Sequence, residues 1–94
     1  MKIYILTSVA LFAEYGDLSS MDSPSISTSI FPTLKEARAQ MKEELVNEKE
    51  EAESSGYTNY KTKHSEREAS FENGEIGSGC SWNLVTWEIT EKKI

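Results

Sequence analysis

The chain has 94 residues, a mass of 10.6 kDa, a net charge of −6 and a pI near 4.8. This length suffices for one modest core, so residues 1–94 are predicted to form a single small domain. The acidic balance argues against direct nucleic-acid binding, no apolar run reaches the roughly 18 residues of a membrane span, and a single cysteine excludes a disulfide framework.

The first segment, Met1–Phe12, has the sequence MKIYILTSVALF, in which β-branched and aromatic residues dominate the first half. This composition predicts a strand. A signal peptide is the alternative, but Lys2 is the only positive charge and no small-residue cleavage site follows Phe12 cleanly. Without an export signal, and with a free thiol, the expected location is cytoplasmic.

A serine-rich loop is predicted over 13–24, where Gly, Asp, Ser and Pro cluster. The next segment, Ser25–Phe31, alternates isoleucine or threonine with serine. This period of two predicts a strand with one buried and one wet face. We expect it to pair antiparallel with the first strand through a connection that is long for a hairpin.

A long helix is predicted over about 33–55. Thr33 occupies the N-cap position and Glu36 follows three residues later, which is the spacing of a capping box. Gly56 is suited to the left-handed residue that ends many helices. One apolar stripe follows the helical repeat; it comprises Leu34, Ala37, Met41, Leu45 and Ala52.

The C-terminal third predicts a β-hairpin over about 65–91, with Asn73-Gly74 as the turn signal. Residues 57–64 are predicted to be a polar connection, partly extended. The resulting order is β-β-α-β-β. It indicates an α+β two-layer sandwich with a four-stranded, mostly antiparallel sheet and one long helix.

Both predicted faces of the sheet carry large apolar side chains, but one helix covers only one face. Trp82 and Trp87 are five positions apart and therefore point to opposite faces of a regular strand. The more continuous apolar sets are assigned to the helix side: Ile3, Ile5, Val9, Leu11, Val85, Trp87 and Ile89. The residues left on the other face form the predicted interaction surface: Tyr4, Leu6, Phe12, Trp82 and Leu84.

Two covers for that second face remain open. The loop 13–24 is one, since Leu18 and Met21 could fold back over the sheet. Another chain is the other, either a protein partner or a second copy in a homodimer. The sequence leaves both covers open, and we predict self-association as a homodimer through the face that bears Tyr4, Leu6, Trp82 and Leu84.

Catalytic chemistry is not expected. Cys80 is the only thiol and precedes a predicted strand, so neither an imidazole at close spacing nor a helix N-terminus is expected beside it to activate the thiol. His64 is the only imidazole and has no second histidine or cysteine at ligand spacing. No metal site and no cofactor are predicted, and the chain is not expected to be an enzyme.

The second half of the predicted helix is acidic: Glu43, Glu44, Glu48, Glu50, Glu51 and Glu53. A solvated face is one interpretation. The other is a mimic of a phosphate backbone, in which spaced carboxylates occupy a basic groove. The function predicted first is therefore a protein-interaction domain that uses the open sheet face, and the alternative is an acidic inhibitor of a basic, nucleic-acid-binding partner.

Overall fold

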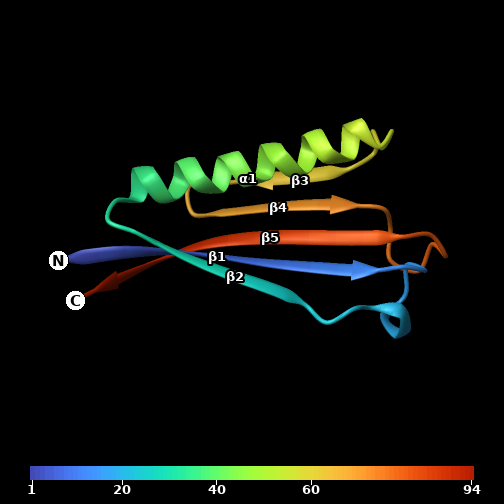
Figure 1. The fold of residues 1–94 in the computed structure, drawn as a ribbon, viewed down its shortest axis with the longest axis horizontal. Helices are drawn as coiled ribbons and strands as arrows, with labels where there is room; N and C mark the ends of the chain where they lie inside the picture. Colours follow the sequence, from blue (N-terminus) through green and yellow to red (C-terminus); the bar gives the residue numbers. More distant parts are fainter.

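Five antiparallel strands and one long helix make up the structure, a computed structural model that describes all residues 1–94 (Figure 1). The strands are β1 (Lys2–Ala13), β2 (Ser25–Phe31), β3 (Lys61–His64), β4 (Glu68–Asn73) and β5 (Trp82–Lys93). The helix α1 (Leu34–Ser54) follows β2, and a short 3-10 helix, η1 (Leu18–Ser20), lies between β1 and β2. The α+β class is thus confirmed, whereas the prediction of four strands is wrong.

The additional strand is β3, in the segment predicted to be a polar connection. Its sequence, KTKH, contains no apolar residue and all four residues are exposed. It forms because its backbone pairs with β4, and because Lys61 lies opposite Glu72 and Thr62 opposite Phe71. Cross-strand pairs of this kind stabilise a strand that has no hydrophobic alternation of its own.

The strand order is β2-β1-β5-β4-β3, so the first and last strands of the chain are neighbours near the middle of the sheet. They pair along their whole length, from Lys2 opposite Lys93 to Ala13 opposite Trp82. The predicted antiparallel pairing of β1 with β2 is confirmed. This arrangement leaves β2 and β3 as the two edges of the sheet (Figure 1).

The helix begins and ends where the sequence predicts, but only one of the two bonds of the predicted capping box is formed, because the Glu36 carboxylate bonds the Thr33 hydroxyl and not the Thr33 backbone N–H. The Thr33 hydroxyl accepts a hydrogen bond from the Glu36 backbone N–H at 3.2 Å and donates one to the Glu36 carboxylate at 3.1 Å. At the other end Gly56 has a φ of +86°. The backbone N–H of Tyr57 donates to the Ala52 carbonyl, and that of Gly56 to the Glu53 carbonyl. This pair of bonds is a Schellman motif, which satisfies carbonyls that the last turn leaves free.

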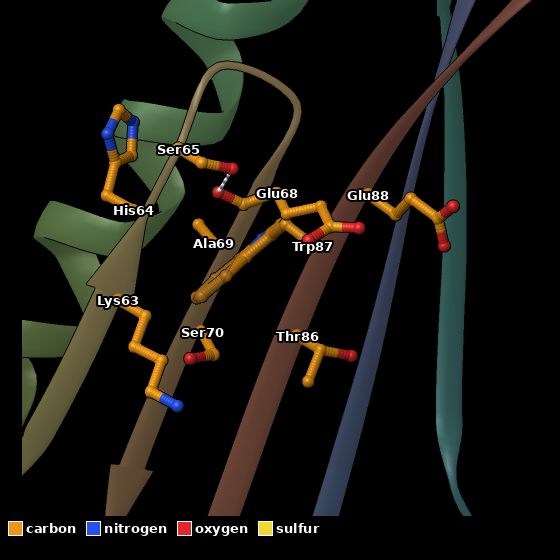
Figure 2. Close-up of a pocket in the computed structure, with 9 residues that line it drawn as sticks. All are labelled: Lys63, His64, Ser65, Glu68, Ala69, Ser70, Thr86, Trp87 and Glu88. Carbon is orange, nitrogen blue, oxygen red and sulfur yellow. Dashed lines mark hydrogen bonds between the residues drawn. The ribbon is translucent and has the colours of Figure 1, made fainter.

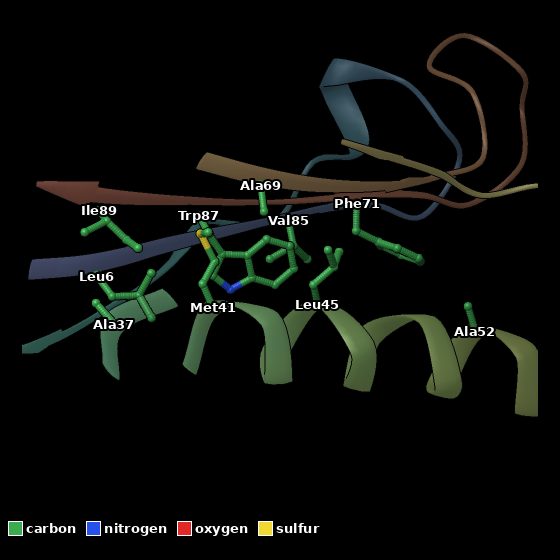
Figure 3. Packing of buried hydrophobic residues seen from close by; sticks show 10 residues of the cluster. All are labelled: Leu6, Ala37, Met41, Leu45, Ala52, Ala69, Phe71, Val85, Trp87 and Ile89. Carbon is green, nitrogen blue, oxygen red and sulfur yellow. The ribbon is translucent and has the colours of Figure 1, made fainter. Parts of the chain in front are cut away.

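The core lies between α1 and one face of the sheet (Figure 3). Met41 and Phe71 are the largest fully buried side chains. The predicted apolar stripe of the helix is confirmed, since Ala37, Met41, Leu45 and Ala52 are all buried. The sheet residues of the core are Leu6, Ala69, Phe71, Val85, Trp87 and Ile89.

The face assignment of β1 is wrong in the sequence prediction. Leu6 is 2% exposed within the core cluster and Tyr4 packs against it, so these even-numbered residues face the helix. Ile5 and Val9 lie on the opposite face. The physical reason is the volume of Trp87, whose neighbours across the two flanking ladders are Ser8 and Ala69. Ser8 opposite the indole leaves room for it, whereas the larger Val9 would not.

Two loops meet at the end of the sheet where β1 finishes and β5 begins. The Gly77 backbone N–H donates to the Gly16 carbonyl, and Met21 forms an antiparallel bridge with Ala13. Ala13 is fully buried here and Trp82 is 7% exposed. Trp82 is therefore buried within a single chain. Of the two residues considered for a loop cover, Leu18 is 73% exposed, whereas Met21 is half-buried and bridged to Ala13.

Candidate interaction surface

The face of the sheet that points away from α1, called the outer face below, has no second layer over it except at the end where the two loops meet and Ala13 and Trp82 are buried. Residues directly opposite each other in a ladder share a face. The pairs Ile5–Ile30 and Val9–Ile26 therefore gather on the outer face over β1 and β2. With the other odd-numbered apolar residues of β1 and one residue of β5 they form what we call the apolar half: Ile3, Ile5, Val9, Leu11, Ile26, Ile30 and Leu84.

Charge is concentrated on the other side of the outer face. The side chains there, called the charged half, are Lys61, Lys63, Glu68, Glu72 and Glu88. One row across the sheet passes from apolar to polar and then to charged side chains. It runs through Ile26, Val9, Thr86, Ser70 and Lys63. The apolar residues thus lie together instead of being scattered singly, which is the distribution that marks an interaction site.

The five predicted interaction residues are not brought together by the structure. Tyr4 and Leu6 lie on the helix side. Phe12 is on the same side at the end of β1 and is 43% exposed. Trp82 is on the outer face but buried, and its indole N–H donates to the Glu72 carboxylate at 2.8 Å. Only Leu84 lies on the outer face and is half-exposed.

The most exposed members of the apolar half were missed by the sequence argument. Ile26 is 68% exposed and Ile30 is 66% exposed. The alternation in Ser25–Phe31 was interpreted as one buried and one wet face, and it predicts the strand correctly. Both faces of β2 are nevertheless wet, because α1 does not extend over this edge strand.

A shallow cavity of about 450 Å³ lies at the opposite edge, between β3, β4 and β5 (Figure 2). Ser70 and Thr86 are a cross-strand pair at its floor, and Lys63 and Glu88 are among the residues around it. The Ser65 hydroxyl donates to the backbone carbonyl of Glu68 at 3.3 Å. No hydrogen bond joins His64 to a hydroxyl, so the cavity contains no nucleophile–base pair.

The two candidates for covalent or metal chemistry lie far from each other along the sheet. His64 is opposite Ala69 at the start of β4, whereas Cys80 follows the end of β4 and is exposed. No group of three or more His, Cys, Asp or Glu side chains is placed to hold a metal ion. The arrangement therefore supplies no recognisable catalytic constellation.

A small cluster of positive charge surrounds a hollow of about 190 Å³ between α1 and β3. Lys35, Arg38 and Lys42 come from the first half of the helix, and His64 comes from the strand. Three of the four basic residues of the helix thus lie in its first half, whereas its second half is acidic. No buried polar group points into this hollow.

Half of the glutamates in the acidic part of the helix are engaged within the chain. The Trp87 indole N–H donates to Glu44 at 3.3 Å, and the Tyr60 hydroxyl donates to Glu53. Glu48 lies on the buried stripe, three positions after Leu45 and four before Ala52. Burial raises the pKa of the Glu48 carboxyl above its usual value of 4.5, and the charges of Glu51 and Glu44 add to this effect.

Because the pKa of Glu48 is raised in the folded chain, we expect the free energy of unfolding to depend on pH. A carboxyl whose pKa is raised by folding favours the folded state while it is protonated, and this contribution is lost as the pH rises through the raised pKa. The variant Glu48→Gln should therefore match the wild type in acid and become progressively more stable than it toward neutral pH. Urea unfolding across a pH series measures the difference. Glu50→Gln on the exposed side of the same helix is the control, and parallel curves for Glu48→Gln would contradict the prediction.

No family model, curated protein or solved structure matches this chain. No helix in the structure combines the length and the apolar character needed to cross a membrane. The apolar half of the outer face is therefore the basis of the proposal below.

Proposed function

We propose that the chain is a non-enzymatic protein-interaction domain that self-associates through the apolar half of its outer face, with a second copy of the chain as the occupant. The observation that carries the proposal is the exposure of Ile26 and Ile30 beside Ile5 and Val9 on a face without a covering layer. Exposed apolar side chains grouped in this way favour association, because burying them removes apolar area from water.

The size of the surface sets the expected strength. We take the apolar half as about seven residues long, at about 3.4 Å per residue, and about three strands wide, at about 4.8 Å per strand. Its flat area is then roughly 340 Å². A stable complex of standard size buries about 800 Å² per partner. The apolar half is smaller than this, so we expect a weak dimer whose population depends on concentration.

The alternative of an acidic inhibitor receives no specific support. Glu44 and Glu53 accept hydrogen bonds from side chains of the same chain, and Glu48 is partly buried. A carboxylate that already accepts a hydrogen bond within the chain has fewer acceptor positions left for the lysine and arginine donors of a basic groove. The exposed thiol of Cys80 is compatible with a reducing compartment, so a cytoplasmic location remains part of the proposal.

Replacing the most exposed member of the apolar half tests the proposal. In sedimentation across a range of concentrations, the wild type should move from monomer to dimer, and Ile26→Glu should remain monomeric over the same range. A carboxylate at this position would have to lose its hydration in the interface.

The matched control is Leu18→Glu. Leu18 is 73% exposed, similar to Ile26, but lies on η1, outside the apolar half. The two variants carry the same net charge, and Leu18→Glu should dimerise like the wild type. A wild-type chain that stays monomeric at every concentration would exclude the proposed function.

A further inference from the structure

The two edges of the sheet differ in how they are protected against pairing with another strand. β3 has four residues, of which two are lysines, and short charged edges resist such pairing. β2 has seven residues, SISTSIF, with no charge and no proline inside the strand. Pro24 and Pro32 flank β2 on either side and limit the segment that can pair. The β2 edge therefore presents an open row of backbone donors and acceptors.

The side chains of β2 are arranged symmetrically about its central residue, Thr28. Ser27 and Ser29 lie on either side of it, and Ile26 and Ile30 lie one step further out. An antiparallel strand with the same sequence, centred on Thr28, would place Ile26 opposite Ile30 of the second copy and Ser27 opposite its Ser29. Each pair then joins like with like, so the strand is complementary to itself.

We propose that β2 pairs antiparallel with β2 of a second copy, centred on Thr28, to join the two five-stranded sheets into one continuous sheet. This inference rests on the self-association of the proposed function, but it places the contact at the β2 edge, where Ile26 and Ile30 are the only members of the apolar half that meet the second copy. The two-fold axis is perpendicular to the sheet and passes midway between Thr28 of one copy and Thr28 of the other. Both outer faces therefore lie on the same side of the joined sheet, and the two apolar halves become neighbours at its centre.

The fold leaves space for this contact. Figure 1 shows α1 running along the β3–β4 side of the sheet, away from the β2 edge. All residues of β2 except the half-buried Phe31 are exposed. The β3 edge at the far side is charged and does not pair with another copy in the same way. Association therefore stops at two copies and does not extend into a fibre.

Two double variants test the register of the joint. Ser27 and Ser29 lie on the helix side of β2 and do not belong to the apolar half. Ser27→Lys combined with Ser29→Lys places two lysine–lysine pairs across the joint and should raise the dimer dissociation constant roughly tenfold or more. Ser27→Lys combined with Ser29→Glu places two lysine–glutamate pairs there and should restore dimerisation. Thermal unfolding of each variant at low concentration checks that the monomer is folded.

A third variant separates this inference from the proposed function. Val9→Lys puts a charge in the middle of the apolar half, on β1, without changing the β2 edge. The inference expects Val9→Lys to dimerise, and a dimer that survives the lysine–lysine variant but is lost in Val9→Lys would overturn it in favour of face-to-face packing. That result leaves the proposed function intact, whereas a wild-type monomer at all concentrations contradicts both.

Discussion

Phe71→Ala is expected to lower the free energy of unfolding by about 3–5 kcal/mol, a large share of the stability of a domain this small. Phe71 is 1% exposed and lies on β4 opposite Val85, on the face of the sheet that packs against α1 (Figure 3). Its ring also packs against Tyr60, with ring centroids 5.3 Å apart. Truncation removes these contacts and leaves a cavity that the paired strands on both sides of β4 cannot collapse to fill.

Phe12→Ala is the matched control for this loss. The same atoms are removed, but Phe12 is 43% exposed and lies outside the core cluster. Its substitution should cost about 1 kcal/mol, typical of a partly buried site. Denaturant unfolding of both variants gives the comparison. If Phe71→Ala cost no more than Phe12→Ala, the packing between α1 and β4 described above would be wrong.

Gly16→Ala is expected to cost about 2–5 kcal/mol, because it combines two penalties. Gly16 has a φ of +69°, a conformation that residues with a Cβ rarely adopt. A Cβ at this position would also lie closer than 3.0 Å to the backbone carbonyl oxygen of Cys80, so one of the two loops would have to move. The bond from Gly77 to the Gly16 carbonyl would then be strained or lost.

Gly79→Ala isolates the first penalty, the backbone conformation, because it has no clash. Gly79 has a φ of +80°, but nothing lies within 4 Å of the position that a Cβ would occupy. It should lose only the about 1–2 kcal/mol of the backbone conformation. Equal losses in Gly16→Ala and Gly79→Ala, measured by urea unfolding, would show that the two loops are not packed together.

The helix could be predicted from sequence because its signals are local. Thr33 and Gly56 lie next to the backbone groups that they satisfy or the turn that they allow, and both act as expected. The pairing of β1 with β2 and the turn between β4 and β5 are similarly close in sequence. β3 could not be predicted in this way, because its partner β4 supplies most of the reason for its conformation.

The faces of β1 could not be chosen by counting apolar residues, since both faces carry them. The deciding factor is the space that the Trp87 side chain needs. Its neighbours on the two flanking strands, Ser8 and Ala69, are both small. That requirement becomes visible only when the register of β1, β5 and β4 is known. The predicted interaction surface inherited the wrong face, so it contained Tyr4 and Leu6 and missed Ile26 and Ile30.

The pairing of β1 with β5 has a consequence for how the protein is made. β1 is made before the other four strands, and its partner along its whole length is β5, the last of the five. Until β5 is made, α1 lacks Val85, Trp87 and Ile89, which form part of the surface on which it packs. The core therefore cannot be completed before β5 has been synthesised. Contacts so distant in sequence also slow folding, so we expect the edge of β1 that faces away from β2 to stay open until β5 arrives.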